Sequence, residues 1–325
     1  MLKLKMIIDN NLIVILLVII MLLILLYRIN KRNLLVKNEG FETQEIGKPK
    51  IAFLFLTYNN LKRPDIWNNF FAIDTKLANK TQSIDNTSVY SNKFTIYNHA
   101  KEKDKVSDLL LSRRHIPEHI DTCWGCFSTV EANILMMKEA LKDPLNKKFI
   151  LVSDSCSPIV SFKKLYKELF KDDKNRINFL KNNNTPERYD QIIEPTFPKS
   201  EFTKHCAQGL IINRTYAELL INSLNEYKAK WKNMTCVDEH YFGNLLRELD
   251  LNFNENTNKK NITFDLWQLD KINSKNLDND DIKSDHYVNL KKISNKAIDK
   301  LREYNFMFIR KIDKDTAIDV EYILT

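Results

Sequence analysis

The feature that most constrains the fold is a run of apolar residues at positions 50–57, with the sequence KIAFLFLT. Nearly every position is apolar, instead of every second one, which predicts a strand that is buried on both faces. A second run of this kind, KFILVSD, covers residues 148–154. Strands buried on both faces belong to largely parallel sheets with helices packed on either side. We therefore expect an α/β domain.

Segments with helical spacing alternate with these strands. Helices are expected at residues 65–71, 128–141, 162–170, 216–227 and 294–303, and further strands at residues 94–99, 208–214 and 306–311. This alternation predicts a mostly parallel central sheet flanked by helices. Ligands of such sheets bind beyond the carboxyl ends of the strands, where Thr57 and Asp154 would lie. No glycine-rich loop follows residue 57, which excludes a Walker A loop and a dinucleotide fingerprint.

A different apolar segment precedes the domain. Residues 12–27 carry no charge and, with the two asparagines before them, approach the length needed to cross a bilayer. No small-residue cleavage site follows, so an uncleaved anchor is favoured over a signal peptide. We therefore predict a tail and transmembrane anchor over residues 1–28, with residues 10–27 in the bilayer. A stem would follow at 29–48, and a folded domain at 49–325.

The flanking charges bear on orientation. Two lysines precede the apolar segment, whereas four basic residues follow it closely: Arg28, Lys31, Arg32 and Lys37. The positive-inside rule therefore favours a cytoplasmic C-terminal domain. The abundance of Asn, Lys and Ile is typical of an AT-rich genome, such as that of a large virus or a protist.

The net charge of +8 permits binding to anions, but the 50 basic residues are spread among 42 acidic ones. No basic tract and no nucleic-acid-binding motif is present, so we expect no nucleic-acid partner.

The chain has five cysteines, at positions 123, 126, 156, 206 and 236. An odd count leaves at least one free thiol or an intermolecular bridge. Cys123 and Cys126 have the spacing of zinc or redox pairs, but no second Cys or His pair stands at a matching distance. We therefore interpret the cysteines as small residues scattered along the chain, with at most one disulfide among them.

Residues 235–249 carry the main candidate for catalysis. Phe242, Leu245, Leu246 and Leu249 follow helical spacing, and Asp238 is the expected N-cap. Glu239 would then lie in the first turn, where the positive helix end keeps a carboxylate ionised. From this stretch alone, Glu239 is either a general base or an acid that stabilises the helix dipole.

Six blocks in this order resemble the core-2/I-branching enzyme family, especially its plant-type branch. The blocks are KIAFLFLT (50–57), WG..S.VEA (124–132), ALKDPLNKKFILVSDSCSP (140–158), QGLIINR (208–214), VDEHY (237–241) and FMFIRK (306–311). Together they span residues 49–312. The resemblance implies a GT-A-like, Rossmann-related fold that follows an N-terminal anchor and stem. Residues 49–325 would then be one catalytic domain.

The resemblance also implies an activity. Its members transfer a sugar, commonly N-acetylglucosamine or xylose, from a UDP donor to an acceptor hydroxyl with inversion. Glu239 matches the family's general base. Lys311, with Arg310 beside it, matches the basic residues that neutralise the leaving diphosphate in place of a metal. A second basic contact is expected upstream, with Arg302, Lys291 and Lys292 as candidates.

Two further observations fit a metal-independent reaction. The strand at 148–154 ends in one acid, whereas metal-using sugar-nucleotide enzymes usually carry Asp-x-Asp there. The pair Asp313 and Asp315 follows the last strand and is interpreted as surface charge. Asp154, Thr57 and Asp238 are the candidates for contacts with the donor or acceptor sugar. One departure is Phe202, near which plant-type relatives carry a tryptophan.

Alternatives remain at this stage. The chain is either a membrane-anchored glycosyltransferase acting on a glycan or glycoprotein, or a non-catalytic sugar-binding or scaffold relative. A third class, a basic protein that binds nucleic acid or anionic lipid, lacks a supporting motif. The family implies a type II protein with its domain in the Golgi lumen, whereas the flanking charges favour the opposite side.

Overall fold

The computed structural model describes residues 47–325, except for positions 82, 85, 178, 181–185, 206–207, 260–261, 267–280 and 286–288. The predicted anchor, residues 10–27, lies outside the described residues, as does nearly all of the predicted stem. Within the described part of the chain, no helix is both long and apolar enough to cross a bilayer.

A six-stranded sheet forms the centre of the domain, in the order β2-β1-β3-β8-β5-β9. Its strands are β1 (Lys50–Thr57), β2 (Phe94–Ala100), β3 (Asn146–Ser153), β5 (Asn175–Arg176), β8 (Ile211–Asn213) and β9 (Thr257–Asn258). β1 pairs in parallel with β2 and β3, and β5 in parallel with β9. β8 is antiparallel to both of its neighbours, so the sheet is mixed. The expected α/β class with a central sheet is confirmed.

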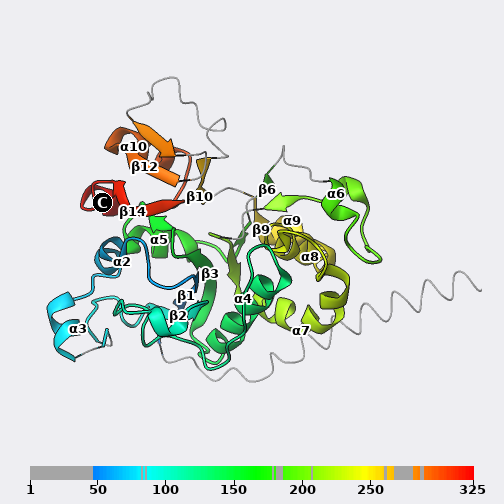
Figure 1. Cartoon of the computed structure of the whole chain (residues 1–325), viewed down its shortest axis with the longest axis horizontal. Coiled ribbons are helices and arrows are strands. Elements are labelled where there is room, and N and C mark those ends of the chain that lie inside the picture. The colour runs from blue at the N-terminus through cyan, green and yellow to red at the C-terminus, as the bar shows by residue number, and fades with distance from the viewer. Residues whose placement is uncertain are drawn as a thin grey trace, which may run out of the picture. The chain divides into compact units, whose positions relative to one another are not determined.

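Helices cover both faces of this sheet (Figure 1). Helices α2 (Pro64–Phe70), α3 (Thr75–Thr81) and α5 (Phe162–Leu169) lie on one face, and helices α4 (Phe127–Ala140), α7 (Arg214–Trp231) and α8 (Tyr241–Leu249) on the other. Successive side chains of a strand point to opposite faces, so β1 contributes Phe53 and Phe55 to the first layer and Ala52 and Leu54 to the second. This division explains why residues 51–56 are apolar throughout.

The first layer is rich in aromatic rings. Trp67 of α2 meets Phe55 edge-on, with ring centroids 5.0 Å apart, and Phe53 at 6.2 Å. Its indole N–H donates to the carbonyl of Cys156 at 3.1 Å, which satisfies the polar atom of a fully buried ring. The contact also fastens the turn after β3 to the helical layer.

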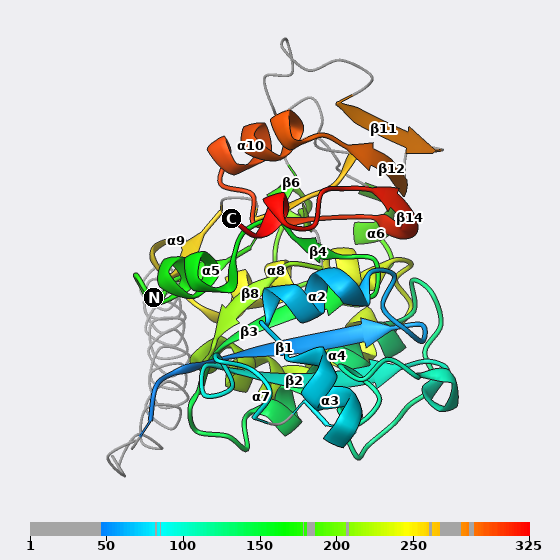
Figure 2. The same cartoon turned by 90° about the vertical axis from the view of Figure 1, so that its left-hand side faces the viewer.

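Smaller sheets adjoin the central one. One three-stranded sheet consists of β4 (Ser157–Pro158), β10 (Thr263–Phe264) and β13 (Phe308–Ile309). A second consists of β11 (Ile282–Asp285), β12 (Asn289–Ile293) and β14 (Ile312–Ala317). A two-stranded sheet consists of β6 (Phe179–Leu180) and β7 (Lys204–His205). Three further helices are α6 (Pro186–Tyr189), α9 (Phe253–Asn256) and α10 (Asn295–Glu303). The 3-10 turns are η2 (Lys103–Lys105), η3 (Lys199–Glu201), η4 (Val237–Glu239) and η6 (Tyr322–Leu324). In Figure 2, the arrow of β1 points towards the side on which β14 and α6 lie.

Candidate active site

Glu239 is the last residue of the 3-10 turn η4, immediately before α8. The prediction that Asp238 caps this helix is wrong, because α8 begins at Tyr241 and His240 occupies the N-cap position. The chain enters η4 through Cys236, whose φ of 51° is left-handed, and the Glu239 N–H donates to the Cys236 carbonyl at 3.1 Å. This tight turn, absent from the helical pattern, separates Asp238 and Glu239 from the helix.

The apolar stripe of α8 holds the turn in place. Phe242, Leu245 and Leu246 are fully buried, as the sequence predicted. Gly243 lies so close to β7 that an added Cβ would stand 2.8 Å from Cδ2 of His205. Its N–H donates to Nε2 of the same histidine at 3.0 Å. Helix α8 is thereby joined to the strand that carries Lys204.

Two cations converge on one oxygen of Glu239. Nη1 of Arg188, from α6, lies 2.8 Å from Oε2, and Nζ of Lys204, from β7, lies 3.1 Å from the same atom. Among the described residues, Oε1 has no hydrogen-bond partner. The side chain of Glu239 is one-third exposed, so this second oxygen remains available to a ligand.

The ion pairs determine the charge of Glu239. Burial would raise the pKa of the carboxyl, but the hydrogen bond from Arg188 and the charge of Lys204 outweigh it and lower the pKa below its usual value. Glu239 is therefore ionised at neutral pH, as predicted. The cause differs from the predicted one, because tertiary cations replace the helix dipole.

Arg188 also determines the tautomer of His240. The same Nη1 lies 3.1 Å from Nε2 of His240, and Nδ1 of the ring lies 3.0 Å from the carbonyl of Thr203. Because an arginine only donates, Nε2 accepts, and the proton resides on Nδ1. Burial lowers the pKa of His240 to about 3, so the ring is neutral. Phe202 stacks on it with ring centroids 4.5 Å apart.

Asp238 has the opposite electrostatic character. Burial, with the charge of Glu239 added, raises its pKa to about 6, and the nearby Arg310 and Arg188 only partly oppose this. The pKa values of these two adjacent carboxyls are thus shifted in opposite directions, below the usual value for Glu239 and up to about 6 for Asp238. This is the electrostatic pattern of acid–base sites.

Arg310 and Lys311 connect β13 to β14 beside the turn that follows β3. The Arg310 N–H donates to the Phe264 carbonyl at 2.8 Å, and the Ile312 N–H to the Ser155 carbonyl at 2.9 Å. The peptide bond between the two basic residues is cis. Burial and the charge of Arg310 lower the pKa of Lys311, while Glu239 and Asp154 oppose this. The two basic residues thus share one electrostatic neighbourhood with both carboxylates.

Asp154 fastens the loop that follows β1. Its Oδ2 accepts the Tyr58 N–H at 3.0 Å, and its carbonyl accepts the Lys62 N–H at 3.0 Å. Thr57 is turned into the sheet, where its hydroxyl lies 3.2 Å from Oδ1 of Asn98. Electrostatic interactions therefore link Arg310 to Asp238, and Lys311 to Glu239 and Asp154, whereas the Thr57 hydroxyl is bonded to Asn98.

Comparison with known proteins identifies the family of this chain. The family model described as Core-2/I-Branching enzyme matches residues 51–302. The chain belongs to the core-2/I-branching enzyme family. It is also similar to the rice protein Glycosyltransferase BC10 (Oryza sativa subsp. japonica), with 24% identity over 253 residues. The match covers 69% of this chain and 59% of the rice protein, so this chain spans less than two thirds of that relative's length.

Arg302, one of the basic residues expected from the family resemblance, bonds backbone carbonyls and an aspartate in the structure. Arg302 of α10 donates from Nε to the Ile159 carbonyl at 2.8 Å and from Nη2 to the Tyr322 carbonyl at 2.9 Å. Its Nη1 lies 3.2 Å from Asp299. These contacts hold α10 against the C-terminal turn.

Sequence reasoning missed Arg188 and Lys204 as ion-pair partners of Glu239. Arg188 stands in residues 181–199, a stretch whose sequence has neither helical nor strand periodicity. Lys204 had one usable signal, since it lies two residues after Phe202, beside the position where plant-type relatives carry tryptophan. For neither residue does the sequence indicate an ion pair with Glu239.

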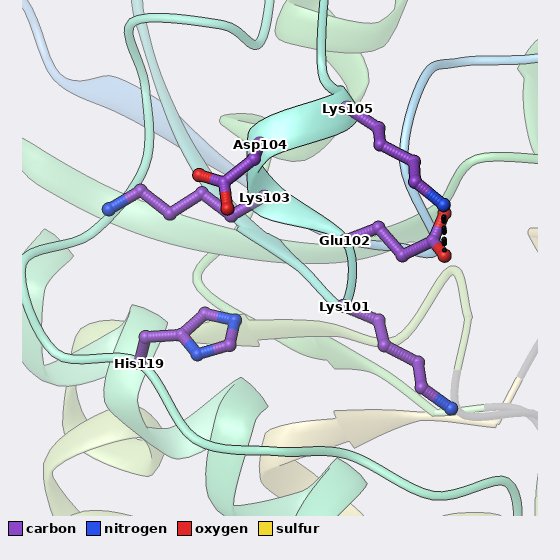
Figure 3. Close-up of a pocket in the computed structure, with 6 residues that line it drawn as sticks. All are labelled: Lys101, Glu102, Lys103, Asp104, Lys105 and His119. Atoms are coloured by element: carbon purple, nitrogen blue, oxygen red, sulfur yellow. Dashed lines mark hydrogen bonds and ion pairs between the residues drawn. The ribbon is translucent and has the colours of Figure 1, made fainter.

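A surface depression lies beside the ends of β1 and β2. Its volume is about 460 Å³, and it is lined by Lys101, Glu102, Lys103, Asp104, Lys105 and His119. Figure 3 shows Lys101 and Lys103 pointing to opposite sides and Glu102 turned towards Lys105, with which it forms a 2.8 Å ion pair. Positive and negative side chains alternate here, and none belongs to the predicted site, so we do not assign it to the active site.

Two of the five cysteines are joined by a disulfide. Cys123 and Cys126 form a disulfide, while Cys156 and Cys236 are free thiols. Cys206 lies outside the described residues. In the described ranges, no three His, Cys, Asp or Glu side chains are grouped so that they could hold a metal ion.

Proposed function

We propose that this chain is an inverting glycosyltransferase that transfers a sugar from a UDP donor to a hydroxyl of a glycan or glycoprotein. The observation that carries the proposal is Glu239, a carboxylate whose Oε2 is held by two cations and whose Oε1 is open. N-acetylglucosamine and xylose are the donor sugars to test first, on the family resemblance. The mixed α/β sheet is compatible with a GT-A-like fold.

In this mechanism the acceptor hydroxyl donates its proton to Oε1 of Glu239. The acceptor oxygen then forms a bond to the anomeric carbon as the bond to the UDP oxygen breaks on the opposite face, which inverts the configuration. A well-placed base accelerates such a step by about 10²–10⁴-fold. Asp154 lies near Lys311 and is proposed to contact the donor sugar.

The leaving UDP gains negative charge, which needs a fixed counter-charge. We assign this role to Lys311 and Arg310, without a divalent cation. The lowered pKa of Lys311 reflects its burial beside Arg310, and a diphosphate bound between them would relieve that repulsion. Activity that persists in EDTA would agree with this assignment, whereas full dependence on added Mg²⁺ or Mn²⁺ would contradict it.

The anchor and compartment form a separate part of the proposal. Residues 10–27 would hold the domain at a membrane, in the Golgi lumen if the family pattern applies. The sequons at Asn79 and Asn233 provide the test, because glycosidase-sensitive glycans on the expressed protein require a lumenal domain. Glycans that are present on a secreted control fusion of the domain but absent from the full-length protein would argue for the cytoplasmic side that the flanking charges favour.

One observation favours a second function. Both cations contact the same oxygen of Glu239, as in a purely structural ion pair, and this would suit a non-catalytic sugar-binding relative. The two functions differ in turnover. An enzyme releases UDP continuously in the presence of an acceptor, whereas a binding protein is stabilised by the sugar without product formation.

The decisive experiment compares Glu239→Gln with the wild type. UDP release is followed with UDP-N-acetylglucosamine and UDP-xylose, each with a glycan acceptor, in EDTA. We expect kcat to fall about 10²–10⁴-fold while the fold is retained. Glu218→Gln is the matched control, since Glu218 forms a 3.0 Å pair with Arg214 on α7. Full activity of Glu239→Gln would refute the assignment of the base.

A further inference from the structure

Trp124 is the most exposed large apolar side chain of the described residues, at 87% of its maximum. Trp67 and Trp231, by contrast, are almost completely buried in the two helical layers. An indole that projects into solvent has the properties of a contact surface, because aromatic rings provide a large and rigid apolar face.

The loop that carries Trp124 is closed and fixed. A disulfide joins Cys123 to Cys126, on either side of the tryptophan. Between them, Gly125 has a φ of +73°, a left-handed conformation that favours glycine. Trp124 is therefore presented by a short, constrained loop, and little conformational entropy would be lost when a ligand packs against it.

This loop rests on the turn that contains Glu239. A Cβ added to Gly125 would stand 3.3 Å from the backbone nitrogen and 3.4 Å from Sγ of Cys236. The carbonyl of Cys236 in turn accepts the Glu239 N–H. A second contact follows at the start of α4, where Phe127 meets Tyr241 edge-on with ring centroids 5.3 Å apart.

We propose that Trp124 is a stacking platform for a sugar ring of the acceptor. The inference rests on the proposed function. One face of a pyranose ring presents C–H groups, which pack on an indole while the hydroxyls stay hydrated. The acceptor is the relevant substrate, because its hydroxyl must reach Glu239, whereas the donor diphosphate belongs to Arg310 and Lys311, which lie beside Ser155.

The charges around the loop argue against a membrane contact. Glu118 and Asp121 are both exposed in the segment that leads to Trp124. Glu118 is paired with Lys138 at 3.8 Å, so Asp121 is the carboxylate that would repel an anionic lipid surface. A neutral or basic glycan is therefore the favoured ligand.

The first test uses Trp124 as its own reporter and requires no turnover. The full-length protein is titrated with N-acetyllactosamine, xylobiose and methyl β-D-galactopyranoside while tryptophan fluorescence is recorded. We expect at least one saccharide to change the emission of the wild type, and Trp124→Ala to abolish that change. No response to any of these saccharides, or a response only to phosphatidylserine vesicles, would overturn the proposal.

The second test separates acceptor from donor effects. We expect Trp124→Ala to raise the acceptor KM about tenfold, equivalent to about 1.4 kcal/mol, with the donor KM and sugar transfer to water unchanged. Trp124→Phe should restore most of the acceptor affinity. Leu251→Ala, which removes another exposed apolar side chain at 80% exposure, is the matched control. An unchanged acceptor KM in Trp124→Ala would overturn the proposal.

The two proposals can fail separately. If the wild type responds to saccharides through Trp124 but releases no UDP with any donor, the stacking platform is supported and the transferase proposal is refuted. If the wild type releases UDP but Trp124 has no effect, the transferase proposal is supported and the stacking platform is refuted.

Discussion

Arg188 and Glu239, 51 residues apart in the sequence, form a 2.8 Å ion pair, and the same guanidinium nitrogen lies 3.1 Å from His240. The orientation of the candidate base is therefore determined by α6 and not by its own turn. Lys204 adds a second charge from β7. The two cations keep Glu239 ionised, and both of them contact Oε2.

Removal of Arg188 should change the pH dependence of the reaction. In Arg188→Ala, Glu239 loses its hydrogen bond and one of two counter-charges, so its pKa should rise. We expect the acidic limb of the kcat/KM profile to move to higher pH. The free energy of unfolding should fall by about 1.5–3 kcal/mol, as for a lost hydrogen bond to a charged group.

Two variants serve as controls for Arg188. Arg188→Lys keeps the charge and should restore part of the acidic limb. Lys142→Ala breaks an exposed pair with Glu139 and should have an effect below about 1 kcal/mol. An acidic limb that stays in place in Arg188→Ala would show that this ion pair does not control the base.

Asp238 offers the sharpest discrimination between two candidate bases. Its pKa of about 6 predicts an acidic limb near pH 6 if it takes the proton, whereas Glu239 predicts a limb below the usual carboxyl range. We expect Asp238→Asn to retain kcat within about tenfold, because the proton is assigned to Glu239. A wild-type limb near pH 6, together with an inactive Asp238→Asn, would transfer the role to Asp238.

Lys311 should affect the donor more than the acceptor. Replacement by alanine removes one of the two charges proposed to face the leaving diphosphate, and we expect kcat to fall by about 10²-fold, as for the loss of a preorganised electrostatic contact. The donor KM should also rise, while the acceptor KM stays similar. Lys314→Ala is the matched control, because Lys314 is exposed on β14. Equal effects of the two substitutions would remove Lys311 from the donor site.

Buried neutral histidines should make the protein sensitive to acid. Burial lowers the pKa of His99 to about 4 and that of His240 to about 3, from an ordinary value of 6.5. Between these values the unfolded chain binds more protons, so stability is fully present above pH 6.5 and is lost as the pH falls. At pH 5 the loss is about 2 kcal/mol for each histidine.

Asp238 acts in the other direction. Its folded pKa is raised to about 6 from 3.8, so the folded protein binds more protons between these values and gains about 1 kcal/mol at pH 5. Urea unfolding at pH 7.5 and pH 5 should therefore show a net loss of stability. His99→Gln should reduce that difference by about 2 kcal/mol, since it removes one titrating ring. Equal stability at both pH values would contradict the prediction.

Much of the fold was predictable from local pattern. The apolar runs at 50–57 and 148–154 form β1 and β3 with the expected parallel pairing, because both faces of these strands are packed with apolar side chains. The stripe Phe242, Leu245 and Leu246 forms the buried face of α8. Asn213 caps α7 by accepting the Tyr216 N–H, so this helix starts two residues earlier than predicted.

Strand direction and cap positions were less predictable. β8 was expected as an ordinary strand of a mostly parallel sheet, but it runs antiparallel to β3, and the apolar pattern of Ile211 and Ile212 is the same in either direction. Asp238 looked like an N-cap because acids favour that position. A left-handed residue at Cys236 instead produced a separate 3-10 turn.

The sequence by itself determined the α/β class, the family and the candidate base, because these depend on residue types and their order along the chain. Tertiary structure alone decided that Arg188 and Lys204 hold Glu239, that the pKa of the adjacent Asp238 is raised, and that Arg302 bonds the Ile159 carbonyl. The physical reason is that charge and pKa depend on distance and desolvation. The distances between charges and the desolvation of each group are determined only when segments far apart in the sequence are packed together.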